Sequence, residues 1–174
     1  MTSVLKVSEI QDPTNGNTAL TVDTSGYTFL KLPHFNMTNT SVQSVPNGTY
    51  TRAEFNTSTS DTHSFVDLTN NKINFTSTTA GVYQINLGGK VENFNGSRMG
   101  YWLRKEGSMN TGPYIAYFET EGDGTYAYPT FNFILSFAAG DFLELDLYQN
   151  QGSTMNTYPQ SQSLGFFISG FRIG

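Results

Sequence analysis

Short stretches in which apolar and polar residues alternate recur along most of the chain. In the sequence DFLELDLY, Leu143, Leu145 and Leu147 lie on one face of an extended strand. Glu144 and Asp146 lie on the opposite face, where we expect them to face water. This period of two is typical of a β-strand with one buried face. Because several such stretches follow one another with Gly- and Asn-rich turns between them, the pattern predicts an all-β sandwich or barrel.

Two further stretches are apolar on both faces. They are FNFILSF (131–137) and GFFISGF (165–171). An ordinary two-layer sandwich buries one face of each strand, so a strand with two apolar faces needs a second surface that covers it. The simplest such surface is another copy of the chain. We therefore expect these two strands to lie in an interface between subunits.

The first 30 residues carry a pattern of their own. VLKVSEI and TALTVDTSG are short alternating stretches, and the QDPTNGN between them contains a strong turn signal. Two strands alone are marginally stable in water, so this segment needs a partner surface. Two interpretations stay open. Residues 1–30 form either a separate attachment segment before a domain spanning 31–174, or the first hairpin of that domain.

Composition and charge exclude several classes of function. The net charge is −5 and no cluster of Lys and Arg is present, which argues against a nucleic-acid partner. The longest apolar run, Phe133–Ala139, is too short to span a bilayer, so we expect no membrane insertion. The absence of cysteine excludes disulfides and thiolate metal sites. The beginning MTSVLKVSEI does not resemble a secretory signal, so we expect a protein made in a cytoplasm and released by lysis.

The spacing of one set of residues is more specific than the strand pattern. These residues are Phe55, Asp61, Leu68, Phe75, Gly81, Tyr83, Ile85 and Leu87. Their spacing resembles the signature of the complement component 1q globular-head family, which belongs with the tumour-necrosis-factor-like jelly rolls. AAGD (138–141) resembles the Gly-Asp turn of that family, and SGF (169–171) resembles its Ser-Gly-Phe ending. The resemblance covers residues 33–174, but no collagen stalk precedes it, which argues against a complement or adipokine role.

The resemblance implies a jelly-roll sandwich of about ten strands, assembled as a homotrimer around a threefold axis. Heads of this type without collagen are similar to the tips and knobs of bacteriophage virion proteins. The N-terminal segment is similar to attachment segments of marine and cyanobacterial phage structural proteins. We therefore expect a location in the virion, where residues 1–30 contact other virion proteins. The residues expected in the trimer interface are Phe131, Phe133, Phe137, Phe167 and Phe171.

Three connections between strands are predicted to meet at one end of the sandwich. They span residues 92–98, 121–128 and 150–163, and every second connection between consecutive antiparallel strands lies at the same end. Tyr, Asn, Ser and Gly in these connections suit a contact surface, as in antibody paratopes, although the same residues also form ordinary turns. The predicted receptor-binding residues are Asn93, Phe94, Asn95, Arg98, Asp123, Tyr126, Tyr128, Met155, Asn156, Tyr158 and Gln160.

Catalytic and metal-binding chemistry have weaker support. Glu144 and Asp146 share a strand face, but solvated strand faces commonly carry such pairs, so we interpret the protein as a non-enzyme. His34 and His63 lack the spacing of metal ligands. We expect no cofactor and prefer a solvated acidic turn to a calcium site in the sequence ETEGDG. The calcium candidates are Glu119, Glu121 and Asp123.

Three functions remain open from the sequence. The first is a trimeric phage fibre-tip or receptor-binding head that contacts a host surface glycan or protein through its distal loops. The second is a capsid decoration or head-fibre protein that docks on the shell through residues 1–30. The third is a glycan depolymerase, which the lack of a convincing carboxylate site disfavours.

Overall fold

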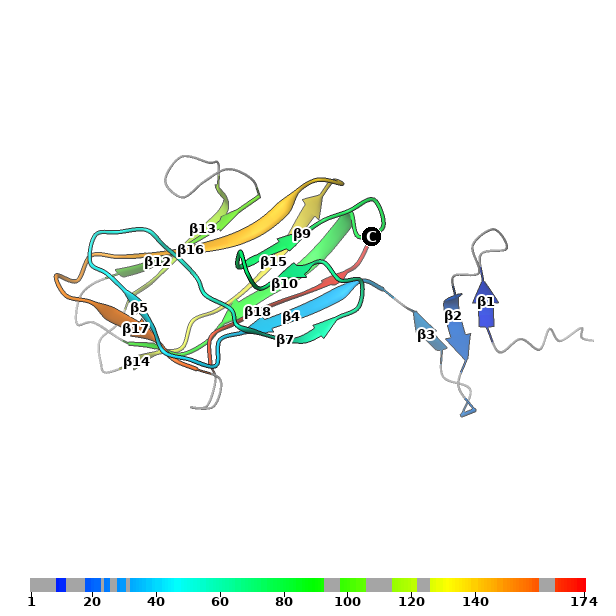
Figure 1. Ribbon diagram of the computed structural model, residues 1–174, viewed down its shortest axis with the longest axis horizontal. Helices are drawn as coiled ribbons and strands as arrows, with labels where there is room; N and C mark the ends of the chain where they lie inside the picture. The colour runs from blue at the N-terminus through cyan, green and yellow to red at the C-terminus, as the bar shows by residue number, and fades with distance from the viewer. Residues whose placement is uncertain are drawn as a thin grey trace, which may run out of the picture. The chain divides into compact units, whose positions relative to one another are not determined.

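The computed structural model describes residues 9–11, 18–22, 24–25, 28–30, 32–92, 98–105, 114–121, 126–159 and 165–174. The chain divides into two compact units, Met1–Leu32 and Pro33–Gly174. Regular structure in the described residues consists of antiparallel β-strands, so the predicted all-β class is confirmed (Figure 1). Within these ranges, no helix is long and apolar enough to cross a lipid bilayer.

The N-terminal unit contains a three-stranded sheet in the order β1-β2-β3. Its strands are β1 (Glu9–Gln11), β2 (Thr18–Val22) and β3 (Thr28–Leu30). β1 and β2 correspond to the two strands of the predicted hairpin, and β3 joins them as a third. In the register, Leu20 of β2 pairs with Ile10 on one side and with Leu30 on the other.

The second unit, here called the head, is a sandwich of two main antiparallel sheets (Figure 1). The five-stranded sheet has the order β15 (Thr130–Phe137), β10 (Gly81–Gly88), β18 (Phe167–Arg172), β4 (His34–Thr38), β7 (Thr57–Asp61). The six-stranded sheet has the order β13 (Tyr114–Glu121), β12 (Arg98–Arg104), β16 (Phe142–Gln149), β9 (Lys72–Asn74), β8 (Val66–Asp67), with β6 (Thr51–Arg52) also paired to β16.

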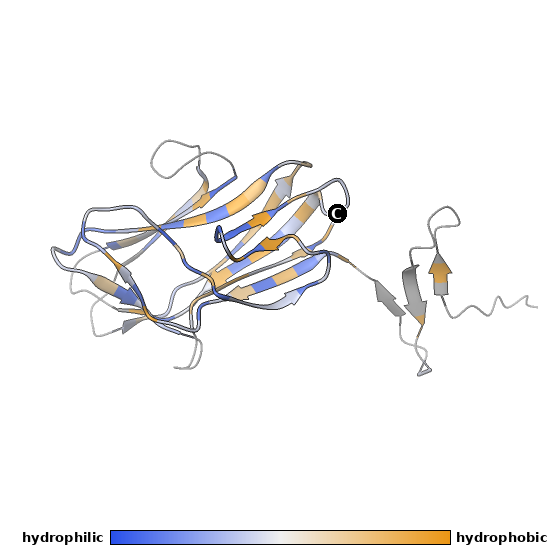
Figure 2. Cartoon of the chain, viewed as in Figure 1, coloured by the Kyte–Doolittle hydropathy of each residue, from blue (hydrophilic) through white to orange (hydrophobic). Residues whose placement is uncertain are grey.

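The core between the two sheets is largely aromatic. Phe75 stacks on Phe137 with 3.9 Å between ring centroids, and Tyr83 meets both rings edge-on. The Tyr83 hydroxyl donates a hydrogen bond to the Thr79 carbonyl at 2.5 Å. Burial raises the pKa of Tyr83 to about 12, so this hydroxyl keeps its proton at neutral pH. Most strands of the two main sheets show apolar and polar residues in alternation (Figure 2).

The residues that carried the family resemblance have structural roles. Five of them are buried core residues, namely Phe55, Phe75, Tyr83, Ile85 and Leu87. The carboxylate of Asp61 accepts hydrogen bonds from the backbone amides of Phe65 and Val66, each at 3.1 Å. In the Ser-Gly-Phe ending, a Cβ on Gly170 would lie 2.6 Å from Phe35 and 2.7 Å from Ile85. The signature is therefore a description of how this core packs.

The side chains of β15 correct the expectation of a strand that is apolar on both faces. The interior positions are Phe131, Phe133, Leu135 and Phe137, which pack on the core or within it. The outer positions between them are Asn132, Ile134 and Ser136. Ile134 alone of these is apolar, so β15 follows the ordinary alternation of a half-buried strand. The run FNFILSF looked apolar on both faces because Ile134 continues the apolar stretch.

Candidate functional site

The predicted tip connections do come together at one end of the head. A four-stranded sheet there has the order β14 (Tyr126–Ala127), β11 (Val91–Glu92), β17 (Met155–Thr157), β5 (Gln43–Val45). Glu92, the first residue of one predicted connection, pairs with Tyr126, and the preceding Val91 pairs with Ala127 and Thr157, so described parts of the three connections lie side by side. We call this end of the head the tip (Figure 1).

The two ends of the head's own chain lie away from the tip. The Arg172 amide donates to the Pro33 carbonyl at 2.9 Å, and the Val82 amide donates to the Gly174 carbonyl at 2.7 Å. Val82 lies at the start of β10, whereas the tip begins just after the end of β10. The tip and the two termini of the head are therefore separated by the length of β10 (Figure 1).

Several predicted receptor-binding residues are available at the surface of the tip. Tyr126 and Tyr128 are exposed, and Asn156 and Tyr158 are half-buried. Arg98 is exposed at the start of β12 and forms an ion pair with Glu119 at 3.1 Å. Five predicted residues lie outside the described residues: Asn93, Phe94, Asn95, Asp123 and Gln160.

Met155 cannot contact a receptor, so this part of the prediction is wrong. Its side chain is fully buried, because β17 alternates between interior and outer positions and Met155 takes an interior one. Val45, which pairs with Met155 across β5 and β17, is also fully buried. An isolated Met among polar residues in the sequence gave no indication of a core position.

Sequence reasoning missed Lys90, which organises the aromatic side chains of the tip. Its ammonium lies 3.8 Å from the ring centroid of Tyr126 and 4.7 Å from that of Tyr158. The two rings meet at 87° with 5.4 Å between centroids, and the Tyr158 amide donates to the Lys90 carbonyl at 3.0 Å. This arrangement holds a cation between two phenol rings at the surface, where the rings and the ammonium can contact polar or anionic groups of a ligand.

The predicted trimer-interface residues divide into three groups. Phe171 is 42% exposed on the outer face of the five-stranded sheet, and Phe167 is half-buried on the same face. Phe131 and Phe133 are half-buried and stack on Phe118, with centroid distances of 4.4 and 4.5 Å. These three rings lie where β15 and β13, the outermost strands of the two sheets, approach each other. They line one edge of the sandwich.

Phe137 is not available to a second copy, so its assignment to the interface is wrong. It is 2% exposed and stacks on Phe75 in the core of its own chain. The sequence did not single out Ile134, which is 66% exposed on the outer face of β15. The period-two alternation contained this information, because Ile134 is out of phase with the four interior residues of its strand.

The outer face of the five-stranded sheet also has an open hollow of about 390 Å³. The residues that line it are His34, Phe35, Asn36, Ser60, Ser169, Gly170 and Phe171. The Asn36 side-chain oxygen is buried there without a hydrogen-bond partner within the chain. Buried polar atoms normally have partners, so this face has the unsatisfied groups expected of a surface that another molecule covers.

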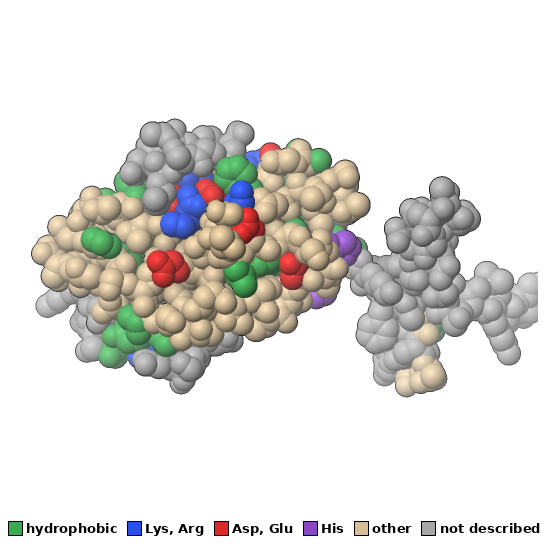
Figure 3. Space-filling model, viewed as in Figure 1, with side chains coloured by type: hydrophobic (Ala, Val, Ile, Leu, Met, Phe, Trp, Pro, Cys, Tyr) green, Lys and Arg blue, Asp and Glu red, His purple; other side chains and the backbone are tan. Residues whose placement is uncertain are grey.

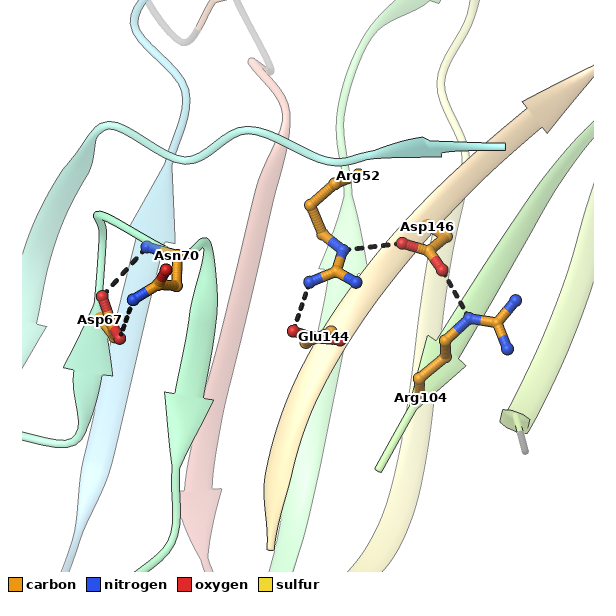
Figure 4. Close-up of polar contacts among 6 residues, drawn as sticks. All are labelled: Arg52, Asp67, Asn70, Arg104, Glu144 and Asp146. Atoms are coloured by element: carbon orange, nitrogen blue, oxygen red, sulfur yellow. Dashed lines mark hydrogen bonds and ion pairs between the residues drawn. The ribbon is translucent and has the colours of Figure 1, made fainter. Parts of the chain in front are cut away.

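Glu144 and Asp146 do not face water, contrary to the sequence expectation. They do point away from the core, but Arg52 of β6 and Arg104 of β12 cover them (Figure 4). Asp146 is fully buried and accepts hydrogen bonds from Arg52 Nε at 2.7 Å and from Arg104 Nε at 2.5 Å. Arg52 also pairs with Glu144. Burial acts to lower the pKa of Arg52, but these carboxylates outweigh burial and raise it.

The arrangement leaves no exposed carboxylate pair on this strand for acid–base catalysis. Of the three calcium candidates, only the side chain of Glu119 lies within the described residues. Glu119 is engaged by Arg98 and by the Tyr117 hydroxyl, while the side chain of Glu121 and all of Asp123 lie outside the described residues. In the described part of the chain, no group of three or more His, Asp or Glu side chains is placed to hold a metal ion.

The Gly-Asp turn before β16 has an electrostatic role that predicts a pH dependence. Asp141 accepts a hydrogen bond from the Ala138 amide at 2.5 Å and pairs with Lys105 at 2.8 Å. Burial acts to raise the pKa of Asp141, but the contacts with Lys105 and Ala138 outweigh it and hold the pKa below 3.8. The resulting stabilisation is complete above the unfolded pKa and is lost as pH falls through the lower folded pKa.

We therefore expect Asp141→Asn to be less stable than the parent at neutral pH. The difference in free energy of unfolding should shrink as pH falls from about 5 to about 2.5, because the parent carboxylate becomes protonated in this range. Urea unfolding of both proteins across these pH values measures the difference. A difference that stays constant with pH would show that the charge of Asp141 contributes nothing to stability.

Solved structures with the same fold are found by comparison of coordinates. Murine APRIL at pH 5.0 superposes with a TM-score of 0.61 at 10% identity, covering 82% of this chain and all of that one. The globular domain of zebrafish complement 1qA gives 0.58 at 13% identity, covering 83% of this chain and 98% of that one. Eiger TNF from S. frugiperda gives 0.57 at 12% identity, with coverages of 82% and 93%.

These superpositions confirm the predicted fold. The head is a jelly roll of the kind found in tumour-necrosis-factor and complement 1q domains. No protein-family model and no curated protein sequence matches the chain. At these identities the similarity concerns the course of the backbone, so activity and partners need arguments from the residues of this chain.

Proposed function

We propose that this protein is a virion component whose head assembles as a homotrimer and contacts the host surface through its tip. The observation that carries the proposal is the gathering of three polar connections at the end of the head opposite its chain termini. The exposed ring of Tyr126 lies there with the half-buried Tyr158 and Lys90, as an aromatic and cationic group. Aromatic side chains with rigid rings and polar tips are the usual anchors of binding surfaces.

Two apolar surfaces on the head support the proposed trimer. One is the outer face of the five-stranded sheet, with Phe167, Phe171 and Ile134. The other is the sandwich edge at β13 and β15, with Phe118, Phe131 and Phe133. When the edge of one copy packs on the face of the next, the contact is heterologous, and a 120° rotation closes it into a ring of three. Threefold assembly is also what the resemblance to complement 1q heads implies.

A trimer would present three copies of the tip. Contacts that are weak in one copy gain strength when three tips bind one surface together, because the second and third contacts form at high effective concentration. We infer a non-enzymatic binding role, since the buried carboxylates of β16 are occupied by Arg52 and Arg104. A host surface glycan or protein is the ligand class that suits the Tyr- and Asn-containing tip.

The N-terminal unit favours a second candidate function. It is a compact unit separate from the head, with a small sheet of its own, as expected for a segment that docks on other virion proteins. The protein would then be a capsid decoration or head-fibre protein, and the head would project from the shell. The phage context of both candidates comes from the sequence resemblance.

Deletion of residues 1–32 separates the two functions. We expect the truncated head to remain folded and trimeric, because its core and both main sheets lie within Pro33–Gly174. If the tip binds the host, the truncated head should bind host cells and compete with phage adsorption. Cell-binding and competition assays measure this, with Lys90→Ala combined with Tyr126→Ala as the variant expected to lose binding. Loss of attachment to capsids, with no binding to cells by either protein, would favour the decoration role.

A further inference from the structure

Five aromatic side chains lie together on the outer face of the six-stranded sheet, where the core does not use them. They are Tyr50, Trp102, Tyr114, Tyr117 and Tyr148, here called the flank cluster. The ring centroid of Trp102 lies 4.1 Å from Tyr117, 4.6 Å from Tyr114 and 5.5 Å from Tyr50. Tyr148 lies 4.8 Å from Tyr50. Trp102 is therefore the centre of the cluster.

Two rings of the flank cluster are open to solvent. Tyr114 is 54% exposed and Tyr117 is 37% exposed. Their planes meet at 63° with 6.3 Å between centroids, and Trp102 contacts both. Tyr114 and Tyr117 thus both pack against Trp102, at an angle to each other, and both of their rings are exposed. An exposed aromatic surface of this extent is typical of a binding site, because isolated folding gives no reason to gather such rings at the surface.

Two buried polar atoms of this face have no hydrogen-bond partner within the chain. They are Trp102 Nε1, a donor, and Glu144 Oε2, an acceptor. A Cβ on Gly100 would lie 3.0 Å from Trp102 Nε1 and 3.0 Å from the Tyr117 ring, so both side chains lie against this glycine. Rotation of Tyr117 away from Gly100 would open the indole N–H to a ligand. A ligand hydroxyl group could then accept from Trp102 Nε1, whereas the Glu144 carboxylate stays covered by Arg52 and Arg104.

The described charged side chains beside the flank cluster form pairs of opposite sign. Arg52 and Arg104 are paired with Glu144 and Asp146, and the ring of Tyr50 lies 5.9 Å from the Arg104 guanidinium carbon. Figure 3 shows cationic and anionic side chains gathered close together on the face that it views. These two cationic and two anionic groups together carry no net charge, so the described part of this surface does not favour an anion such as a phosphate backbone. An apolar peptide would leave Trp102 Nε1 without a partner.

We propose that the flank cluster binds a neutral sugar residue of a glycan, as a second binding surface besides the tip. A pyranose ring has an apolar face of C–H groups that can lie on Tyr114 or Tyr117. One of its hydroxyl groups can accept a hydrogen bond from Trp102 Nε1 once Tyr117 has rotated. The site lies on the outer face of the six-stranded sheet, beside the β13 edge that would meet the next copy, so each subunit of a trimer would carry one such site.

The test uses Trp102 as its reporter, because it is the only tryptophan in the chain. The full chain is titrated with the methyl glycosides of glucose, galactose, mannose and N-acetylglucosamine while the tryptophan emission is recorded. We expect a saturable change of emission with at least one of them. Tyr114→Ala should weaken that binding roughly tenfold, since it removes one stacking surface. Tyr128→Ala is the matched control, because Tyr128 is 53% exposed but outside the cluster.

The proposal is overturned if none of the four glycosides changes the emission. It is also overturned if Tyr128→Ala weakens binding as much as Tyr114→Ala, because the sugar then binds elsewhere. A change of oligomeric state in Tyr114→Ala without a change in sugar affinity would assign the cluster to a subunit contact instead. These measurements use purified protein and free sugars, so they do not depend on the proposed virion role or on binding at the tip.

Discussion

Ile134→Lys is expected to convert the proposed homotrimer into folded monomers. Ile134 is 66% exposed in the single chain and lies on the outer face of β15, at the edge that would meet the next copy. In a closed ring of three, the substitution places an ammonium group in each of three contacts. An unpaired buried charge costs roughly 3–5 kcal/mol, so assembly should weaken by roughly a thousandfold or more. Light scattering coupled to size-exclusion chromatography measures the mass.

Val42→Lys provides the matched control for this substitution. Val42 is also an exposed aliphatic residue, at 49%, but it precedes β5 at the tip and lies outside the proposed contacts. We expect this variant to stay trimeric. Circular dichroism of Ile134→Lys should remain that of a folded β protein, since the side chain points away from the core. A trimeric Ile134→Lys protein, or a parent protein that is monomeric at micromolar concentration, would contradict the proposed interface.

Asp146→Asn is expected to give the largest loss of stability among single substitutions of charged residues in the described chain. The Asp146 carboxylate is fully buried and lies between Arg52 and Arg104 (Figure 4). Removal of its charge takes a buried ion-pair partner from both Arg104 and Arg52. The free energy of unfolding should fall by about 3–5 kcal/mol, as measured by urea unfolding monitored by tryptophan emission.

The control is Asp67→Asn, which removes a carboxylate near the surface. Asp67 accepts hydrogen bonds from the backbone and side-chain nitrogens of Asn70, and these contacts lower its pKa (Figure 4). Because water can replace these contacts, we expect a much smaller loss of stability than for Asp146→Asn. Equal losses in the two variants would mean that the network of Arg52, Arg104, Glu144 and Asp146 does not depend on its central charge.

The tip illustrates how far sequence reasoning could go for the candidate site. Counting antiparallel strands predicted that three connections meet at one end, and the pairing of β11 with β14 and β17 joins them there. The same reasoning could not assign individual side chains. Met155 is buried, while Lys90, which had no motif around it, lies between Tyr126 and Tyr158. Connections follow from strand order, but contacts between side chains depend on the exact register.

The sequence by itself determined the β class, the interior face of most strands and the jelly-roll fold of the head. Alternation is a local property with a fixed period, so Leu143, Leu145 and Leu147 had to share a face, and they are all buried. The family-like spacing reflects core packing for the same reason.

Only the tertiary structure decided what covers the other face of each strand. Glu144 and Asp146 point outward as predicted, yet β6 brings Arg52 over them from a distant part of the chain. Alternation places Phe137 and Ile134 on opposite faces of β15, but only the packing of the two sheets stacks Phe75 on Phe137. The flank cluster likewise joins Tyr50 to Trp102, which lie far apart in the sequence. A local pattern fixes which side chains share a face, whereas long-range strand pairing fixes their neighbours.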